Sequence, residues 1–275
     1  MCDMKTLYLT DLDGTLLRSD ESVSGHTKNI VNHFVQGGGL FSYATARSFV
    51  TASKVTAGLN AEFPIICYNG AFIYGNRSKE ILRSNFFTEA DVARVKRVLT
   101  EHNIFPIVYA YIKSQERFSF LEHSMNDGIR SFVERRAGDP RCRAVLGADD
   151  LYAGDVFYFT CIGNEKELAP VYENFKSDRQ LVCIYDKDMY SNDPWFEIMP
   201  ANATKASAAL QLKEMLGCDK LVVFGDGRND LSLFLVADES YAMSNAVPEL
   251  KEIATGVIGS NDDDGVAQWI EVNVL

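Results

Sequence analysis

Residues 6–15 read Thr-Leu-Tyr-Leu-Thr-Asp-Leu-Asp-Gly-Thr, a short apolar run that ends in two aspartates and a glycine. The run Thr6–Thr10 predicts a buried strand. In an extended chain, side chains two positions apart point the same way, so Asp11 and Asp13 can face one reacting centre. Open α/β sheets bind their ligands at the carboxyl ends of parallel strands. An ordinary Asp-Gly turn with two solvated carboxylates has the same letters, so the motif needs support from elsewhere in the chain.

The first third of the chain alternates short apolar runs with amphipathic stretches. Apolar residues at helical spacing predict a helix over Thr27–Gln36, which three glycines end. Leu40–Ala44 and Pro64–Tyr68 are the next expected strands, with a helix over Ser48–Gly58 between them. Strand, helix and strand in this order predict a parallel sheet wrapped by helices. Asn69-Gly70 is then the signal of a hairpin turn between two apolar runs.

Residues 85–198 have a different pattern of apolar and polar residues. Thr88 is expected to cap a helix that reaches Glu101. Several of the following segments alternate apolar and polar residues, as a sheet with one covered face does. Strands are expected at Ile107–Ile112, Phe118–Leu121, Val156–Ile162 and Leu181–Tyr185.

The alternation of strands and helices returns towards the end of the chain, where we expect a helix from Thr204 to Leu216 and a strand over Leu221–Phe224. We therefore predict an α/β fold whose core is a Rossmann-like, doubly wound parallel sheet built from residues 1–84 and 199–275. In this prediction residues 85–198 form an inserted α+β domain, or cap.

A second acidic loop follows the strand Leu221–Phe224. It reads Gly-Asp-Gly-Arg-Asn-Asp over residues 225–230 and opens a helix. Two acidic loops at two strand ends suit a shared site, although carboxylates about 4 Å apart repel by about 4 kcal/mol at an effective dielectric of about 20. A divalent cation compensates such repulsion. Because every candidate ligand is an oxygen and no histidine or cysteine lies nearby in sequence, the pattern favours Mg²⁺ over zinc.

Two further groups suit an anion near these loops. Thr45 follows the second strand and offers a hydroxyl, together with the backbone amides of Ala46 and Arg47 near a helix start. Lys205 opens the helix after the inserted segment, with Thr204 as its N-cap. Taken singly, a threonine at a strand end and a lysine on a helix are more often ordinary surface groups than functional ones. Arg47 alone is expected to be solvated or salt-bridged.

In the order Asp-x-Asp, Thr, Lys and Gly-Asp-x-x-Asn-Asp, these elements resemble the motifs of the haloacid dehalogenase superfamily. The inserted segment is similar to the type IIB cap of the Cof-like sugar-phosphate phosphatases. Ala46 departs from the family, which commonly has glycine there, and Ala201–Ala206 replaces the usual Gly-Val-Ser-Lys-Gly. Both departures bear on local backbone shape and on substrate preference. The resemblance covers almost the whole chain and includes Ile66–Ala71, Glu197–Pro200, Ala242–Ala246 and Asp264–Ala267.

The resemblance implies an Mg²⁺-dependent phosphatase of small phosphate monoesters, with sugar phosphates foremost. Asp11 is then the nucleophile that becomes an aspartyl phosphate, and Asp13 donates and accepts the proton. The implied metal ligands are the Asp11 carboxylate, the Asp13 backbone carbonyl and Asp226. Asp230 is implied to orient Lys205 or a metal-bound water. The groups implied for the phosphoryl oxygens are Thr45, Ala46, Lys205 and Asn229, with Arg47 in support.

Other functions share parts of this pattern. A phosphomutase uses the same two aspartates and differs in what the cap admits, and phosphatases of pyridoxal or flavin phosphates stay open as alternatives. A dehalogenase has no use for Asp13, since halide needs no proton. A receiver-type switch also combines clustered aspartates, threonine, lysine and Mg²⁺. Such a module needs only about a hundred residues and no large insertion, and it must preserve a phospho-aspartate that Asp13 would help to hydrolyse.

Composition and charge exclude several classes of binding partner. The net charge of −11 argues against a nucleic-acid surface and against docking on anionic lipid, but it leaves room for a small phosphorylated metabolite in a locally positive site. The six cysteines and four histidines have no zinc-ligand spacing. No apolar stretch has the length of a membrane helix, and no signal-peptide pattern is present, so we expect a cytoplasmic protein. Nothing in the sequence sets the oligomeric state.

Overall fold

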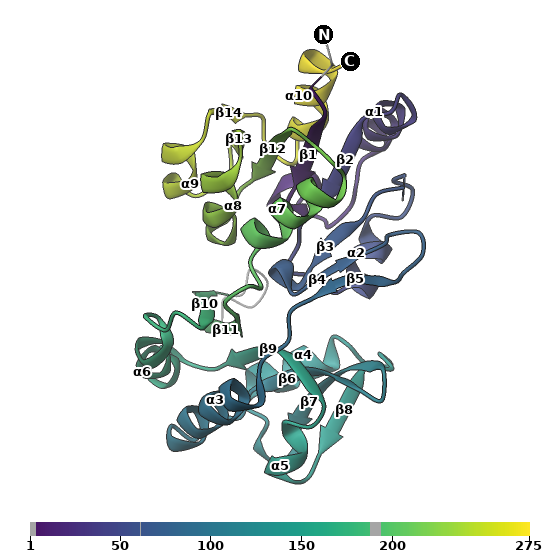
Figure 1. The fold of residues 1–275 in the computed structure, drawn as a ribbon. Coiled ribbons are helices and arrows are strands. Elements are labelled where there is room, and N and C mark those ends of the chain that lie inside the picture. The colour runs from purple at the N-terminus through teal and green to yellow at the C-terminus, as the bar shows by residue number, and fades with distance from the viewer. Residues whose placement is uncertain (1–3, 61, 188–193) are drawn as a thin grey trace. The chain divides into compact units, whose positions relative to one another are not determined.

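The computed structural model describes residues 4–60, 62–187 and 194–275 (Figure 1). The chain divides into two compact units, Met1–Ser84 with Asn202–Leu275, and Asn85–Ala201. The predicted fold class is confirmed: a parallel sheet forms the α/β core, and the inserted unit has a mixed sheet of its own. The second boundary lies at 201/202, whereas the sequence placed it at 198/199, because the last strand of the inserted unit continues to Pro200.

The core sheet of the first unit has five parallel strands in the order β14-β13-β12-β1-β2. β1 lies inside this sheet, between β12 and β2. Its Leu7 and Leu9, like Val223 of β12, are completely buried, as expected for strands covered on both faces. The strands are β1 (Thr6–Thr10), β2 (Leu40–Tyr43), β12 (Lys220–Gly225), β13 (Glu239–Met243) and β14 (Gly256–Ile258).

Helices surround the core sheet. The first helix packs against the last, α1 against α10, and α7 packs against α8. The side chain of Thr204 accepts a hydrogen bond from the Ser207 amide and so begins α7, as the sequence predicted. None of the helices in the described part of the chain has the length and apolar character needed to span a bilayer. The helices of this unit are α1 (Gly25–Gln36), α2 (Phe49–Val55), α7 (Lys205–Met215), α8 (Leu231–Val236), α9 (Pro248–Ile253) and α10 (Gly265–Asn273).

One expected strand takes a different place. The run Pro64–Tyr68 contributes β3, which forms an antiparallel hairpin with β4 instead of extending the parallel sheet. A single parallel bridge between Ala44 and Ile66 connects β3 to the end of β2. The predicted turn is confirmed at Asn69-Gly70, where φ is +52° and +105°. This turn reverses the chain, so a small sheet starts here. Its strands are β3 (Ile65–Cys67), β4 (Phe72–Tyr74) and β5 (Ile81–Ser84).

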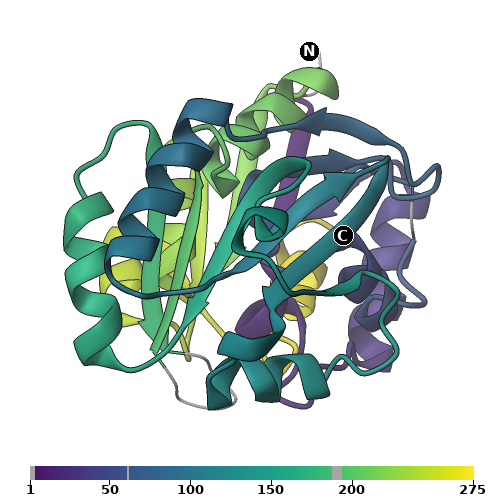
Figure 2. The same cartoon turned by 90° about the horizontal axis from the view of Figure 1, so that it is seen from below.

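The second unit is built on a six-stranded sheet in the order β10-β11-β9-β6-β7-β8, antiparallel except between β7 and β8. α3 and α6 lie side by side (Figure 2) and supply Val95 and Leu168 to a core shared with Phe159 of the sheet. The helix predicted after Thr88 is confirmed as α3. The elements are α3 (Glu89–Glu101), β6 (Ile107–Ile112), β7 (Gln115–Leu121), α4 (Asp127–Glu134), β8 (Cys142–Val145), α5 (Ala148–Leu151), β9 (Asp155–Ile162), α6 (Glu165–Phe175), β10 (Leu181–Lys187) and β11 (Pro194–Pro200).

Gly70 ties the hairpin to the start of α7. A Cβ atom at Gly70 would lie 2.2 Å from the backbone oxygen of Thr204, whereas a Cβ atom at Gly38, which also has a positive φ, would meet nothing within 4 Å. We predict that Gly38→Ala lowers the free energy of unfolding by about 1–2 kcal/mol, for the left-handed backbone alone. Gly70→Ala should cost about 1–3 kcal/mol more, because backbone must move. Chemical denaturation measures both variants, and equal losses would contradict the close approach.

Candidate active site

Three strands of the first unit end at one edge of the core sheet, and a polar residue follows each of them. β1 ends in register with β12 and with β2. The amide of Asp11 donates to the carbonyl of Phe224 at 2.9 Å, which fixes the chain as it leaves β1. Asp11, Thr45 and Asp226 therefore start out from the same edge, as expected for residues that follow the ends of parallel strands.

The side chain of Lys205 lies between two aspartates at this edge. Its Nζ lies 2.8 Å from Asp11 Oδ1 and 2.7 Å from Asp230 Oδ1, and the lysine is only 1% exposed. The other oxygen of Asp230, Oδ2, accepts hydrogen bonds from the amides of Asp226 and Gly227, both at 3.1 Å. Asp230 thus holds the lysine with one oxygen and shapes the acidic loop with the other.

The carboxylates at this edge form a compact group. One oxygen each from Asp11, Asp226 and Asp230 lie within 4.8 Å of one another. Three carboxylates face the single ammonium of Lys205, so the group carries excess negative charge when all of them are ionised. The donors are all hard oxygen atoms, which suits a divalent cation such as Mg²⁺ and not zinc. The residues present therefore fit a metal site.

Burial and the excess of carboxylates shift the pKa values of the side chains in this group. Burial raises the pKa of Asp11 well above its ordinary value; Lys205 opposes this rise, and the charges of Asp230 and Asp226 add to it. Burial, followed by the charge of Asp230, raises the pKa of Asp226 to about 7. Burial alone would lower the pKa of Lys205, but the adjacent Asp11 and Asp230 raise it above its ordinary value. Lys205 therefore stays charged at neutral pH.

The turn after Asp13 packs directly on Asp226. Gly14 has φ +72°, and a Cβ atom there would lie 2.3 Å from Asp226 Oδ2. The Thr15 hydroxyl donates to Asp226 Oδ1 at 2.8 Å, and the Asn245 side-chain amide donates to the Gly14 carbonyl at 2.8 Å. Sequence reasoning assigned no role to Thr15 or Asn245. Thr15 completes the first acidic motif and Asn245 lies in one of the segments that carry the resemblance, so both had a sequence signal.

Thr45 is placed to receive an anion. It is completely buried, and its Oγ1 accepts from the Arg47 amide at 3.0 Å, so the hydroxyl hydrogen can be donated elsewhere. Its backbone bonds to Ile66 and Asn69 fix the residue between β2 and the hairpin. Among the described residues the amide of the exposed Ala46 has no hydrogen-bond partner, and it can donate to a ligand. The amide of Arg47, predicted to do the same, is instead used within the turn.

Arg47 holds Asp13. Its Nε and Nη2 donate to the two oxygens of the Asp13 carboxylate, at 2.8 and 2.5 Å. Nη2 also donates to Glu21 Oε2 at 2.6 Å. The arginine that the sequence expected to be solvated or salt-bridged is therefore bound to the residue proposed for proton transfer. Glu21 was not predicted, and no local pattern marks it, since it meets Arg47 only through the fold.

Asn229 lies next to the hairpin turn. Its side-chain amide donates to Asn69 Oδ1 at 3.3 Å, and the amide of Asn69 donates to the carbonyl of Thr45 at 2.9 Å. Asn69 is buried and adopts a left-handed conformation with φ +52°. The hairpin turn therefore links the acidic loop to Thr45, a role that its turn signal alone did not reveal.

Comparison with known proteins finds similar sequences that cover almost the whole chain. The profile of haloacid dehalogenase-like hydrolases matches residues 8–270. A 5-amino-6-(5-phospho-D-ribitylamino)uracil phosphatase of Bacillus subtilis is 28% identical over 95% of this chain and 95% of its own length. A second phosphatase of that name from the same organism is 24% identical over 96% of each chain.

Solved structures have the same fold. A haloacid dehalogenase-like hydrolase from B. subtilis superposes with a TM-score of 0.80 at 20% identity, covering 98% of this chain and 100% of the other. A protein from Thermotoga maritima gives 0.76 at 24% identity and covers 98% and 97%. Both units of the chain therefore have counterparts in these structures.

The raised pKa of Asp226 makes stability depend on pH. In the folded, metal-free protein this group keeps its proton up to about pH 7, whereas in the unfolded chain it loses it near pH 4. The contribution of Asp226 to the free energy of unfolding therefore falls as pH rises from about 4 to about 7. Asp226→Asn, which cannot ionise, should be more stable than the wild type by an amount that grows by about 1–3 kcal/mol between pH 5 and pH 8 in EDTA.

Thermal denaturation at the two pH values measures this difference. Asp238→Asn is the matched control, because hydrogen bonds from Lys213 and from the Leu221 amide lower the pKa of Asp238. Its substitution should destabilise the protein about equally at pH 5 and pH 8, because Asp238 is ionised at both pH values in the folded and in the unfolded chain. A gain in Asp226→Asn that is equal at pH 5 and pH 8 would show that its carboxylate is not destabilised by its neighbours.

Proposed function

The chain belongs to the haloacid dehalogenase-like hydrolases and is a phosphatase, and we propose that it hydrolyses small phosphate monoesters through an aspartyl phosphate on Asp11. The observation that carries this proposal is the buried contact of Asp11 with Lys205, at 2.8 Å, beside an anion-binding threonine and a second aspartate two positions on. A nucleophile, a fixed cation and a proton carrier thus share one edge of the sheet.

We assign the cofactor as Mg²⁺. The carboxylates of Asp11 and Asp226 and the backbone carbonyl of Asp13 would hold it. Asp230 is a poorer ligand than its place in the cluster suggests, because Lys205 and two backbone amides already engage its oxygens. Bound there, the ion would offset the charge between the nucleophile and the phosphoryl oxygens.

The first half of the reaction uses two aspartates. Lys205 binds Oδ1 of Asp11, so we assign the attack on phosphorus to Oδ2. The bond between phosphorus and the ester oxygen breaks as the new bond forms, and the leaving oxygen takes a proton from Asp13. The Thr45 hydroxyl, the Ala46 amide and Lys205 would stabilise the negative charge on the transferring group.

In the second half, water attacks the aspartyl phosphate. Asp13 takes a proton from that water, the bond between Asp11 and phosphorus breaks, and inorganic phosphate leaves. The Arg47 pair suits this half, because two hydrogen bonds from one guanidinium fix the orientation of the Asp13 carboxylate. For the first half Asp13 must turn away from Arg47 and gain a proton. Glu21 gives the arginine a second carboxylate to bind when this happens.

The relatives indicate the class of leaving group. The two Bacillus phosphatases act, by their names, on a ribityl phosphate joined to a pyrimidine. A phosphorylated polyol chain resembles an open sugar phosphate, which agrees with a preference for small phosphorylated metabolites. We propose sugar and polyol phosphates as substrates, with pyridoxal and flavin phosphates as the alternative set. We also propose that Asn229 contacts the substrate.

Replacement of the two aspartates tests the proposed roles. Asp11→Asn should abolish turnover, because the nucleophile is lost. Asp13→Asn should lower kcat on alkyl phosphates by about 10²–10⁴, the usual share of general acid–base catalysis. The loss should be smaller with p-nitrophenyl phosphate, whose leaving group needs little protonation. Asp263→Asn, at an exposed aspartate outside the site, is the control and should keep full activity.

Steady-state kinetics and the pH dependence of kcat supply the measurement. Arg47→Lys removes the two-pronged contact that positions Asp13 and should lower kcat without abolishing turnover. Wild-type activity in Asp11→Asn would contradict the aspartyl phosphate. An equal loss on both kinds of leaving group in Asp13→Asn would contradict its role as proton donor.

A panel of phosphate esters tests the substrate and the metal together. We expect the highest kcat/KM among hexose, pentose and polyol phosphates, with little activity on a phosphopeptide. Activity should vanish in EDTA and return with Mg²⁺ but not with zinc alone. A best value for the phosphopeptide, activity in chelator, or isomer interconversion faster than hydrolysis, as in a phosphomutase, would each overturn part of the proposal.

A further inference from the structure

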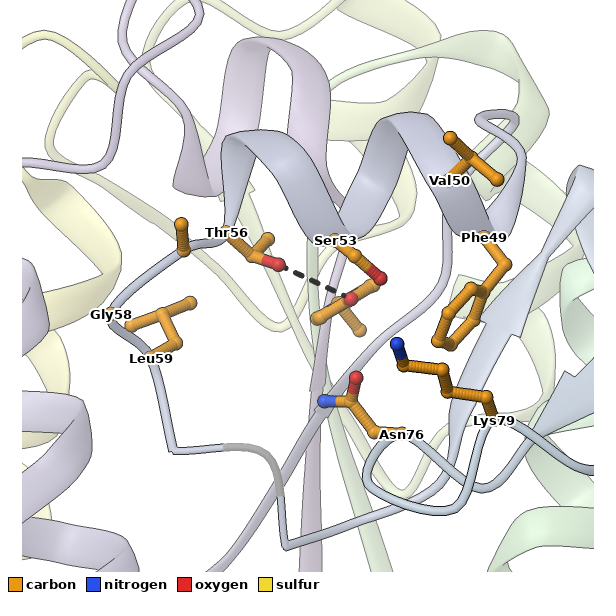
Figure 3. A pocket seen from close by; sticks show the side chains of 10 residues that line it. Phe49, Val50, Ser53, Thr56, Gly58, Leu59, Asn76 and Lys79 are labelled. Atoms are coloured by element: carbon orange, nitrogen blue, oxygen red, sulfur yellow. Dashed lines mark hydrogen bonds between the residues drawn. The ribbon is translucent and has the colours of Figure 1, made fainter. Parts of the chain in front are cut away.

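A pocket of about 580 Å³ opens on the first unit beside α2. α2 and the turn after it form one wall, and the loop between β4 and β5 forms the opposite wall (Figure 3). Its volume lies in the usual range of small-molecule sites. None of the residues that line it belongs to the catalytic centre described above, so the phosphatase reaction does not account for it. The lining residues are Tyr43, Phe49, Val50, Ser53, Thr56, Ala57, Gly58, Leu59, Asn76 and Lys79.

One part of the pocket is apolar. Phe49 lies on the right in Figure 3 and packs against Tyr74 with ring centroids 5.0 Å apart, so the ring is held in place. Val50 is 54% exposed, and Leu59 lies across from them on the turn after α2. These side chains offer a surface for a small hydrocarbon or aromatic group.

Polar groups meet at the middle of the pocket. Figure 3 shows Lys79 and Asn76 reaching from their loop towards Ser53 of α2. The Oγ of Ser53 is buried and has no hydrogen-bond partner among the described residues, which is unusual for a hydroxyl. Lys79 likewise has no ion pair within the described part of the chain. An unused hydroxyl, an amide and an ammonium thus converge on one volume.

The loop between β4 and β5 leaves the ammonium of Lys79 available for a ligand. Its other cation, Arg77, already pairs with Glu62. Lys79 adopts φ +62°, a conformation that glycine or asparagine would adopt more easily, and its amide donates to the Gly75 carbonyl at 2.7 Å. Backbone of this kind recurs at ligand-binding positions. The loop therefore fixes the base of Lys79 while its ammonium reaches into the pocket.

We propose that this pocket binds a small organic monocarboxylate, with the carboxylate on Lys79 and Ser53 and the apolar body against Phe49 and Leu59. One ammonium with hydroxyl and amide donors matches a single carboxylate. A phosphate dianion would bring more charge than Lys79 alone balances, and it would leave the apolar wall uncovered. The ligand is thus a molecule other than the substrate or the phosphate product.

The test uses 3-phenylpropanoate as the probe, with the full chain and isothermal titration calorimetry. The neutral 3-phenylpropanamide has the same shape and no charge. We expect saturable binding of the acid with a dissociation constant of about 1 mM or lower, and binding of the amide at least about tenfold weaker. Saturating inorganic phosphate with Mg²⁺, which would occupy the catalytic centre, should leave the affinity unchanged.

Substitutions then locate the site. Lys79→Asn removes the charge and tolerates the left-handed backbone, so the loop should keep its shape; it should weaken binding at least about tenfold. Ser53→Leu should fill the pocket and abolish binding. Lys54→Gln is the matched control, because Lys54 is an exposed lysine on the same helix that does not line the pocket. Wild-type affinity in Lys79→Asn, displacement by phosphate, equal binding of acid and amide, or no saturable binding would each overturn the proposal.

Discussion

The ammonium of Lys205, buried between Asp11 and Asp230, is the contact on which the rest of this centre depends. A buried charge is tolerated only when it is paired, and removing either partner leaves an uncompensated charge in the interior. The three residues come from the end of β1, the start of α7 and the loop after β12. Their pairing therefore requires the strand register, the N-cap of α7 and the fold of the acidic loop to be correct at the same time.

This pairing leaves the centre acidic. One lysine offsets only part of the charge of three carboxylates, and burial together with this excess charge raises the pKa values of Asp11 and Asp226. Keeping these carboxylates ionised costs stability in the metal-free chain, and a bound cation would offset that cost. The hydrogen bond from Thr15 and the close approach of Gly14 hold Asp226 in place, so the group that repels its neighbours is fixed by the turn of the first motif.

How far the sequence predicts this structure depends on the range of each interaction. Local patterns predicted three of the five core strands, β1, β2 and β12, and the Thr88 and Thr204 caps. They also predicted the meeting of two acidic loops at one edge, since parallel strands bring their carboxyl ends together. They failed where tertiary contacts decide. Arg47 meets Asp13 and Glu21 only in the folded chain. The third apolar run was expected in the parallel sheet, but it pairs with the strand after its own predicted hairpin turn.

The insertion raises the question of how Lys205 keeps its place when Asn85–Ala201 separates it in sequence from the hairpin. A long excursion costs chain entropy, but that cost grows only slowly with length once the ends of the loop are fixed. Here they are fixed by backbone. The hairpin turn packs on α7, and Gly70 has no side chain, so the Thr204 carbonyl approaches it closely at the residue that caps α7. Because that contact lies within the first unit, the start of α7 is fixed by backbone of the same unit that carries Lys205.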